Sequence, residues 1–310
     1  MPSNLYPLGA LPARFRRQRV LIVGCGDVGL RTAKVMGRNV RLLALTSSPD
    51  RIARLRAAGI TPLRGNLDEA ATLARLAGLT TRVLHLAPPP STGETDPRSQ
   101  ALVRALARRS LPQALVYIST TGVYGDCGGA WVAETRMPAP ASERARRRVD
   151  AEATLRALGR QGVRVGVLRV PGIYAADRPG GAPRERLLRG TRLLRAEDDV
   201  YVSHIHADDL ARACVLALWR ALPQRICHVA DESSLRMGDY FDLAADVYGL
   251  PRLPRISRAQ AQRELTPAML GFLGESRRLL TARMRRELRL KLRFATVREG
   301  LAASVADQRG

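Results

Sequence analysis

The chain has 310 residues, of which 45% are hydrophobic and 25% are charged. These values are ordinary for a soluble globular protein, and no apolar run approaches the roughly 18–20 residues of a membrane span. The composition therefore excludes a membrane-embedded protein, and the length fits one large domain or a domain with an appended lobe.

The formal net charge of +23 predicts non-specific attraction to nucleic acid and to anionic surfaces. Lys34 and Lys291 are the only lysines, however, and so strong an excess of arginine is typical of nucleotide-composition bias in a genome. The arginine clusters at 144–148 and 283–289 fall on predicted helices, where charge runs usually form a solvated face. We therefore predict that nucleic acid is not the main partner of this protein, and a nucleic-acid-associated protein stays an alternative that the charge alone motivates. We predict no membrane partner.

Residues 1–18 contain no apolar segment followed by a small-residue cleavage site, which argues against a secretory signal. We expect a disordered leader there and a cytoplasmic protein. The cysteines are scattered and show no metal-binding spacing; they are Cys25, Cys127, Cys214 and Cys227. This usage indicates free thiols in a reducing compartment and predicts no metal site.

A glycine-rich loop follows the first predicted strand, which is almost wholly apolar. Gly24, Gly26 and Gly29 form a G-x-G-x-x-G pattern, and a helical pattern begins within it. The first glycine of such a loop makes a tight turn, the second admits a pyrophosphate and the third lets the helix pack on the strand. Because a helix N-terminus favours anions, we assign these glycines, with Asp27 and Val28, to dinucleotide binding. The alternative is a strand–helix turn without a ligand.

After this loop, strand and helix patterns alternate at the spacing of βαβ units. The predicted strands are 40–45, 61–64, 82–86, 114–119 and 164–169. The predicted helices are 49–58, 69–77, 97–109 and 142–158. Continuous apolar runs are typical of strands that are buried on both faces of a parallel sheet. We therefore predict an α/β protein with a Rossmann-like, doubly wound parallel sheet.

Past Pro171 the pattern becomes less regular. We predict helices at 185–195, 208–221 and 237–248, strands at 200–205 and 226–229, and short helices from 259 to 306. These elements indicate a smaller C-terminal α/β lobe at 176–310, which closes one side of the cleft of a Rossmann domain at 19–175. The two could also count as one domain.

Several motifs after the glycine loop follow one another in the order known from one superfamily. They are His85-Leu86-Ala87, Ser119-Thr120-Thr121-Gly122-Val123-Tyr124-Gly125, Arg169-Val170-Pro171-Gly172-Ile173-Tyr174 and His204-Ile205-His206-Ala207-Asp208-Asp209-Leu210. With the glycine loop, they make the chain resemble the NAD-dependent epimerase/dehydratase family of the extended short-chain dehydrogenase/reductases over residues 19–250. The resemblance implies an NAD(P)-binding protein in which Leu86 and Ala87 line the cofactor site.

The resemblance also implies a catalytic tyrosine and, four residues later, a lysine that lowers the pKa of the tyrosine and holds the cofactor ribose. This chain contains no Tyr-x-x-x-Lys pair. When Glu152 is matched to the helical glutamate of the family, Arg144 stands in place of the tyrosine and Arg148 in place of the lysine. Arg144 stays protonated near neutrality and cannot shuttle a proton, whereas Arg148 could bind a ribose or a phosphate.

Two residues remain as candidate catalytic groups. Thr120 matches the serine or threonine that orients the substrate in the family, and Tyr124 follows it in the same motif. The other candidates are more often structural at such positions; they are Tyr174, His85, His204 and His206. The pair of histidines on one strand has no third ligand nearby, which again predicts no metal.

The end of the second predicted strand bears on the choice of nucleotide. An acidic residue there would bind the ribose 2′-hydroxyl of NAD. This strand ends instead near Thr46 and Ser47, with Arg51 close behind. Hydroxyl groups and an arginine suit a 2′-phosphate, so we predict that NADP is favoured over NAD. By the resemblance, Asn66 and Leu67 match an Asp-Leu pair at the adenine.

We therefore predict an atypical family member that binds NAD(P) and acts as an oxidoreductase or epimerase on a small molecule that the sequence does not identify. The alternative is a non-catalytic dinucleotide sensor or interaction protein. The missing tyrosine and lysine favour the sensor, whereas the lobe over the cleft favours an enzyme. Family members often dimerise through two helices, so a homodimer is an expectation that rests on the resemblance alone.

Overall fold

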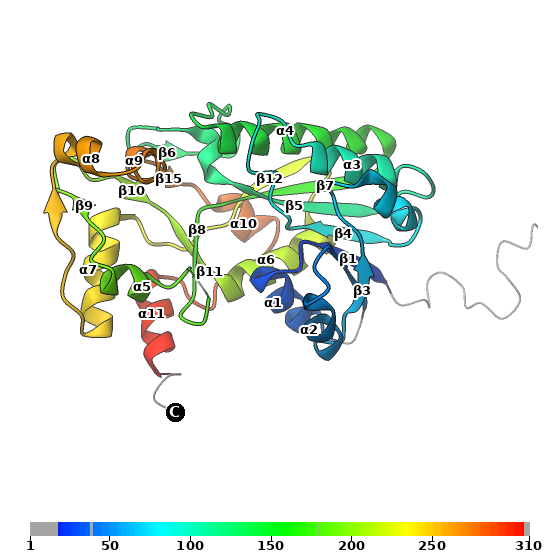
Figure 1. The fold of residues 1–310 in the computed structure, drawn as a ribbon, viewed down its shortest axis with the longest axis horizontal. Coiled ribbons are helices and arrows are strands. Elements are labelled where there is room, and N and C mark those ends of the chain that lie inside the picture. Colours follow the sequence, from blue (N-terminus) through cyan, green and yellow to red (C-terminus); the bar gives the residue numbers. More distant parts are fainter. Residues whose placement is uncertain (1–17, 38–39, 179, 307–310) are drawn as a thin grey trace, which may run out of the picture.

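A parallel sheet of seven strands forms the centre of the computed structural model, which describes residues 18–37, 40–178 and 180–306 (Figure 1). Its strands are β1 (Arg19–Val23), β2 (Arg41–Thr46), β3 (Thr61–Arg64), β4 (Arg82–His85), β5 (Ala114–Thr120), β7 (Arg164–Val170) and β12 (Arg225–His228). They lie in the order β12-β7-β5-β4-β1-β2-β3, and every neighbouring pair is parallel. The predicted parallel sheet is confirmed, whereas residues 1–17 of the predicted leader lie outside the described residues.

Helices cover both faces of this sheet (Figure 1). One face carries α1 (Asp27–Met36), α2 (Arg51–Ala57) and α6 (Ala207–Arg220), and the other carries η3 (Ala70–Leu76), α3 (Pro97–Leu106) and α4 (Glu143–Ala157). Side chains of β1 alternate between the two cores, with Val20 and Ile22 in the first and Leu21 and Val23 in the second. The apolar run of β1 therefore reflects burial on both faces, as expected for a parallel sheet.

The helix predicted at 69–77 is the 3-10 helix η3 rather than an α-helix. The Thr72 hydroxyl donates to the Glu69 carbonyl at 2.7 Å and accepts from the Asn66 backbone nitrogen at 2.9 Å. The hydroxyl thus occupies backbone groups that would form hydrogen bonds in the first turn of an α-helix, which favours the 3-10 helix. Leu73 and Leu76 still fill the core, so the apolar pattern identified the buried face but not the type of helix.

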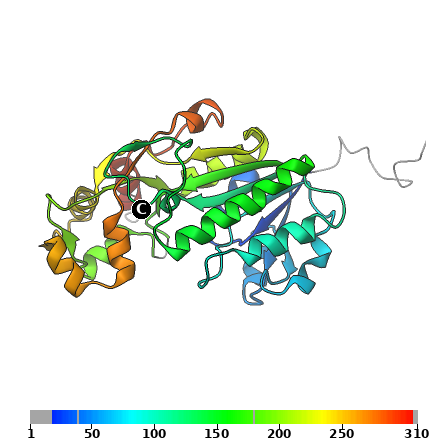
Figure 2. The same ribbon diagram turned by 90° about the horizontal axis from the view of Figure 1, so that it is seen from above.

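The second half of the chain forms a lobe beside one end of the sheet, as Figure 1 and Figure 2 show. The lobe has a core of its own around Tyr240 and Phe241. Residues 176–310 also contribute to the sheet domain, since α6 covers one face of the sheet and β12 is its edge strand. The division into two domains stays a prediction.

The remaining elements are η4 (Thr121–Tyr124), β6 (Trp131–Val132), η5 (Leu158–Gln161), β8 (Gly172–Tyr174), α5 (Pro183–Leu188), β9 (Leu193–Leu194), β10 (Tyr201–Val202), β11 (His204–His206), β13 (Leu235–Arg236), α7 (Met237–Tyr248), β14 (Arg255–Ile256), α8 (Arg258–Glu264), α9 (Pro267–Gly274), β15 (Arg278–Leu279), α10 (Ala282–Arg286) and α11 (Val297–Ala306).

Two elements of the lobe differ from the sequence-based prediction. The helix predicted at 185–195 ends early as α5, because Gly190 adopts φ +62° and turns the chain toward β9. The strand predicted at 200–205 is divided into β10 and β11, which pair with β13 and β8. None of the helices in the described ranges is long and apolar enough to cross a membrane.

Candidate functional site

The strand order reverses between β1 and β4, and in open parallel sheets ligands bind in the crevice at such a point. Leu86 and Ala87 follow β4 there, and both donate hydrogen bonds to the Val23 carbonyl, at 2.8 and 2.9 Å. Gly24 has φ +83°, and a Cβ at Gly24 would lie 2.5 Å from the backbone nitrogen of Ala87. Glycine is therefore required at position 24 by its conformation and by the close passage of the chain after β4.

The other two glycines of the loop have different surroundings. Gly26 precedes α1, and a Cβ placed there would meet nothing within 4 Å. A Cβ at Gly29 would lie 3.1 Å from Cys25 Sγ, so glycine permits the close packing of α1 on β1. Asp27 and Val28 are the first two residues of α1. The start of α1, with its first-turn N–H groups and the positive end of its helix dipole, therefore lies next to the open space at Gly26.

The end of β2 carries hydroxyl groups rather than a carboxylate. Thr46 is half-buried, and its hydroxyl accepts a hydrogen bond from the Ser48 backbone nitrogen at 3.2 Å. Ser47 and Arg51 are exposed, and Arg51 begins α2. These three predicted cofactor residues therefore lie together on the outer rim of the crevice. Their assignment to a 2′-phosphate stays a prediction.

Asn66 and Leu67 follow β3 on the same side of the sheet. The Asn66 side chain already has local partners, since its oxygen accepts from the Asp68 nitrogen at 3.1 Å and its amide donates to Glu69 Oε1 at 2.9 Å. Leu67 is buried in the second core. The loop is further held by Arg98, whose guanidinium binds both carboxylate oxygens of Asp68 at 2.7 Å. Packing and local hydrogen bonds therefore fix the shape of this part of the rim.

A cavity of about 530 Å³ lies between the sheet and the second lobe. The end of β5 contributes Thr120, the start of α4 contributes Arg144, and the lobe contributes His204. The Thr120 hydroxyl accepts a hydrogen bond from the Gly122 nitrogen at 3.2 Å and so is fixed at the cavity wall. The structure therefore brings two sequence-predicted positions, Thr120 and Arg144, to one cavity.

The two arginines of α4 that replace the expected tyrosine and lysine have different environments. Arg144 is exposed, lines the cavity and makes no polar contact within the described part of the chain. Arg148 is half-buried and reaches the sheet, where its guanidinium donates to the Ile118 carbonyl at 2.7 Å and to the Tyr117 hydroxyl at 3.1 Å. Arg148 does not line the cavity, and its position is fixed by β5.

Tyr124 lies outside the cavity lining and is fully buried. Its hydroxyl accepts from Arg169 at 2.8 Å and lies 2.6 Å from His228 Nε2. Arg169 in turn binds Glu152 through two hydrogen bonds, of 3.1 and 2.6 Å. Burial raises the pKa of Tyr124 and lowers the pKa of His228 to about 4, which keeps both groups neutral. This network fixes α4 against β7 and the end of β12.

His204 was predicted to be structural, and the structure adds that it lines the cavity. Its ring stacks on Tyr240 with the centroids 3.9 Å apart, and burial lowers its pKa to about 3. A neutral imidazole therefore forms part of the wall. Period-2 alternation in β11 could have placed His204 and His206 on the same side, but it could not tell which group faces a cavity.

Tyr201, Glu275 and Arg277 also line the cavity, and the sequence analysis did not identify them. Arg277 donates to Glu275 at 2.7 Å and to the Gly125 carbonyl at 2.9 Å, so these charges are paired. No motif marks them, because they lie far along the chain from the loops that they meet.

The other weighed candidates have structural surroundings. His85 is fully buried beside Ser99 Oγ at 3.1 Å, and burial lowers its pKa to about 3. The Tyr174 hydroxyl donates to the Thr296 carbonyl at 3.4 Å. His206 Nδ1 accepts from the backbone nitrogen of Asp208 at 3.2 Å and so caps α6. Within the described residues, no group of three or more His, Cys, Asp or Glu side chains could hold a metal ion.

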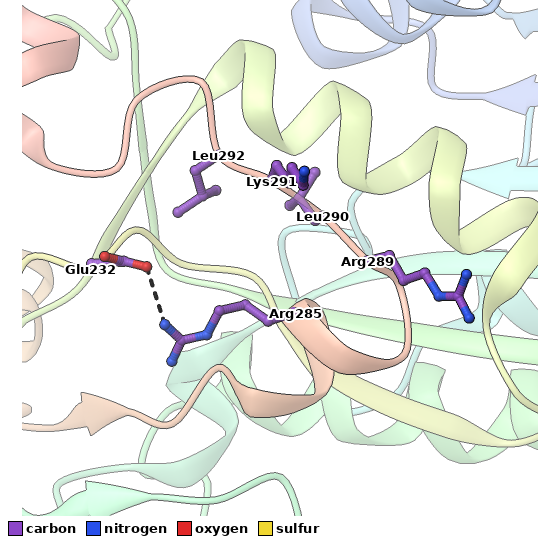
Figure 3. A pocket seen from close by; sticks show the side chains of 6 residues that line it. All are labelled: Glu232, Arg285, Arg289, Leu290, Lys291 and Leu292. Carbon is purple, nitrogen blue, oxygen red and sulfur yellow. Dashed lines mark hydrogen bonds and ion pairs between the residues drawn. The ribbon is translucent and has the colours of Figure 1, made fainter.

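A second cavity of about 310 Å³ lies at the surface beside α10 (Figure 3). Arg285 forms an ion pair with Glu232 at 3.1 Å there, and Arg289 and Lys291 add positive charge. The residues of the segment after α10 alternate, with Arg289 and Lys291 exposed and Leu290 buried. This pattern fits a solvated charged face over an apolar core, as the sequence analysis expected for this cluster.

Comparison with known proteins gives one family and a set of similar structures. A model of the NAD dependent epimerase/dehydratase family matches residues 20–230. A conserved protein of unknown function from Silicibacter pomeroyi DSS is 30% identical, with a TM-score of 0.79 and with 94% of this chain and 99% of that chain covered. No protein with a curated description matches the chain.

Two more distant structures share the fold. The UDP-glucose 4-epimerase of Thermotoga maritima, solved with UDP-glucose, is 19% identical with a TM-score of 0.75, and the match covers 94% of this chain and 98% of that one. The UDP-glucuronic acid 4-epimerase of Bacillus cereus, solved in complex with NAD, is 16% identical with a TM-score of 0.72, and the match covers 94% of this chain and 100% of that one. At these identities the likeness shows the fold alone.

Proposed function

We propose, from the premise that this chain belongs to the NAD-dependent epimerase/dehydratase family, that it binds NAD(P) at its glycine loop and acts as an oxidoreductase or epimerase on a small molecule in the adjoining cavity. One observation carries the proposal. Gly26 leaves open space at the start of α1, where a Cβ would meet nothing, although Gly24 and Gly29 on either side are tightly packed. Packing within the protein therefore does not require glycine at position 26, whereas the close approach of a pyrophosphate to the backbone does.

The rim of the crevice supports a preference for NADP. The NAD-bound epimerase of similar fold supports a nicotinamide dinucleotide as the class of cofactor. In this chain Thr46, Ser47 and Arg51 stand where a carboxylate would bind the 2′-hydroxyl of NAD. An arginine binds a phosphate through paired N–H groups, and the absence of a carboxylate there removes repulsion.

The residues of the cavity define what the chain itself can contribute to a reaction. A bound nicotinamide would supply or accept the hydride at a carbon of the substrate, and solvent water in the cavity would supply or accept the matching proton of the substrate oxygen. We assign to the Thr120 hydroxyl a hydrogen bond to the reacting oxygen of the substrate. Arg144 stabilises negative charge on that oxygen but does not give up its proton, because a guanidinium stays charged. Tyr124 acts as a positioning residue, since its hydroxyl holds Arg169 and His228 outside the cavity.

Calorimetric titration with NADP, NADPH, NAD and NADH tests the proposal. At moderate salt, which suppresses non-specific anion binding, we expect the NADP forms to bind about tenfold or more tightly than the NAD forms, a difference of about 1.4 kcal/mol. Gly26→Val places a side chain where the pyrophosphate would lie and should abolish binding, and Gly26→Ala should weaken it.

Thermal unfolding of the two variants is the control, since nothing packs against position 26 and both should stay folded. Tighter binding of the NAD forms would remove the NADP preference but keep the site. If none of the four nucleotides binds, or if Gly26→Val binds as well as the unchanged chain, the cofactor site is wrong.

A dinucleotide sensor without turnover is the second candidate, and one observation favours it. By the sequence match, Arg144 replaces the proton-transfer tyrosine, and within the described residues no polar contact holds its guanidinium in place. Incubation of the purified protein with NADPH and a panel of aldehydes and ketones separates the two candidates. Oxidation of NADPH supports the enzyme, whereas tight binding without any turnover supports the sensor.

A further inference from the structure

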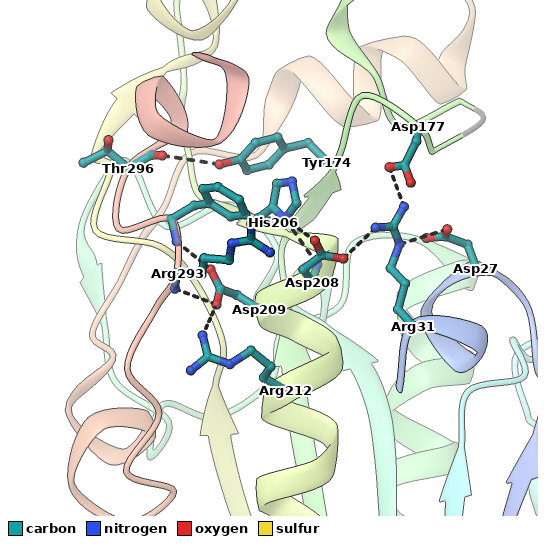
Figure 4. A network of polar contacts seen from close by, with 11 residues as sticks. Asp27, Arg31, Tyr174, Asp177, His206, Asp208, Asp209, Arg212, Arg293 and Thr296 are labelled. Atoms are coloured by element: carbon teal, nitrogen blue, oxygen red, sulfur yellow. Dashed lines mark hydrogen bonds and ion pairs between the residues drawn. The ribbon is translucent and has the colours of Figure 1, made fainter. Parts of the chain in front are cut away.

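Arg31 of α1 forms the centre of an ion-pair network that joins the glycine loop to the second half of the chain (Figure 4). Its guanidinium binds Asp27 at 3.1 Å, Asp177 at 2.5 Å and Asp208 at 2.6 Å. Asp27 begins α1, Asp177 follows β8 and Asp208 lies in the first turn of α6. The Arg31 side chain is 15% exposed, and these carboxylates raise its pKa. Arg31 is therefore a fixed structural cation.

A second arginine, Arg178, reaches the same carboxylate from the loop after β8. Arg178 binds Asp27 at 2.9 Å, and its side chain is 26% exposed. The Arg178 backbone nitrogen donates to the Ala175 carbonyl at 3.3 Å, and the Arg178 carbonyl accepts from the Gly181 nitrogen at 3.0 Å. A Cβ at Gly181 would lie 2.5 Å from Cδ of Arg178, so glycine at position 181 leaves room for the Arg178 side chain.

The position of Asp27 conflicts with the proposed ligand. Asp27 is the first residue of α1, beside the backbone groups that would bind a dinucleotide diphosphate. Two negative groups would then share one helix N-terminus, and like charges at short range repel. Arg31 holds Asp27 through one carboxylate oxygen, and Arg178 holds the other. Of the two arginines, Arg178 is the more exposed and has one ion pair rather than three, so it costs less to move.

We propose that Asp27 and Arg178 form a charge switch, in which a bound dinucleotide takes Arg178 from Asp27 and binds it through a diphosphate oxygen. The proposal rests on the dinucleotide site proposed above. Without the ligand, Asp27 holds Arg178 at the mouth of the crevice. With the ligand, the guanidinium gains a phosphate partner, while Arg31 remains to neutralise Asp27. The segment that carries Asp177 and Arg178 is thereby coupled to cofactor binding, although it belongs to the substrate side of the cleft.

Two substitutions with opposite expected effects test the switch. Arg178→Gln removes the diphosphate partner and should weaken binding of NADP and of ADP-ribose about tenfold or more, as for loss of a charge-assisted hydrogen bond. Asp27→Asn removes the competitor and should strengthen binding of both ligands several-fold, although it should lower the temperature of unfolding. In the double variant, which carries both substitutions, Asp27→Asn still removes the repulsion of the diphosphate. It has no Arg178 left to release, so the changes in binding free energy of the two single variants should not add.

Arg189→Gln is the matched control. Arg189 directly follows α5, is 68% exposed and pairs with Glu185 of that helix. Its loss lowers the net charge equally and should leave both affinities unchanged. A purely structural ion pair predicts that Asp27→Asn weakens binding or has no effect, and either result overturns the switch. Unchanged affinity in Arg178→Gln overturns it as well. If the unchanged chain binds neither ligand, the proposed cofactor site and the switch both fall.

Discussion

The glycine loop and the start of α4 lie at the same end of the sheet, but their residues are constrained in different ways. At the loop, Gly24 is fixed by a positive φ and by the backbone of Ala87, so no other residue fits. At the start of α4, Arg144 is exposed and touches nothing that requires an arginine. The backbone of the first region thus preserves its sequence, whereas the side chains of the second could change without loss of the fold. This difference fits the proposal that the glycine loop binds a cofactor while Arg144 and Arg148 stand where the family resemblance implies a tyrosine and a lysine.

The largest expected effect is a response to pH, and it arises outside both regions, behind the cavity that adjoins the start of α4. Asp231 lies behind the cavity wall, where its nitrogen donates to the His204 carbonyl at 2.8 Å, and burial raises its pKa to about 8. The folded protein therefore holds the Asp231 proton more tightly than the unfolded chain, in which its pKa is 3.8. The contribution of this proton to the free energy of unfolding is complete below pH 3.8 and is lost as pH rises through 8. The loss approaches about 1.4 kcal/mol per pH unit within that window.

Asp231→Asn isolates this contribution. Urea unfolding at pH 5, 7 and 9 should show that the variant gains stability relative to the unchanged chain as pH rises, and that it is the more stable of the two at pH 9. The depressed pKa of His204, about 3, acts in the opposite direction and cancels in the comparison, since both proteins contain it. A difference that does not change with pH would contradict the assignment.

Two glycine substitutions test whether the backbone fixes the loop. Gly24→Ala forces a side chain into a left-handed conformation and against Ala87, so we expect a loss of about 2–4 kcal/mol of unfolding free energy. Gly26→Ala should change stability by less than about 1 kcal/mol, because its Cβ meets nothing. Urea unfolding of both variants checks the pair, and equal losses would show that packing does not distinguish these positions.

The smallest expected effects concern the two arginines of α4. Arg148→Met removes the hydrogen bonds to Ile118 and Tyr117 and should cost about 1–2 kcal/mol of unfolding free energy. Arg144→Met should stay within about 0.5 kcal/mol of the unchanged chain, as expected for an exposed side chain that has no polar partner among the described residues. Parallel denaturation curves measure both. A large loss in Arg144→Met would mean that the start of α4 is constrained after all.

The sequence predicted those parts of the molecule that short-range patterns determine. The apolar run of β1 and the glycines after it predicted a buried parallel strand and a tight loop, because each requires particular residues at fixed spacing. The helix type of η3 was not predictable from apolar spacing, since the Thr72 hydroxyl decides it. The division of the strand predicted at 200–205 likewise depends on which neighbouring strands are present to pair with it.

The candidate site was predictable only in part, for a related reason. Thr120 and Arg144 lie in motifs that are local in sequence, and both line the cavity. Glu275 and Arg277 line the same cavity from a segment more than a hundred residues further along, and nothing in their own spacing reveals it. The pairing of Arg31 with Asp177 is equally non-local. Such contacts follow from how the lobe packs on the sheet rather than from any motif.

The return of α6 and β12 to the sheet has a consequence for synthesis of the protein on the ribosome. When the chain has emerged as far as β7, Leu84, Val116 and Leu168 still lack the helix that covers them. At roughly 5–20 residues per second, the wait for α6 lasts several seconds. During that interval a broad apolar face is open to chaperones and to other nascent chains. Because β12 ends at His228, the seven-stranded sheet cannot be complete until translation has passed that residue.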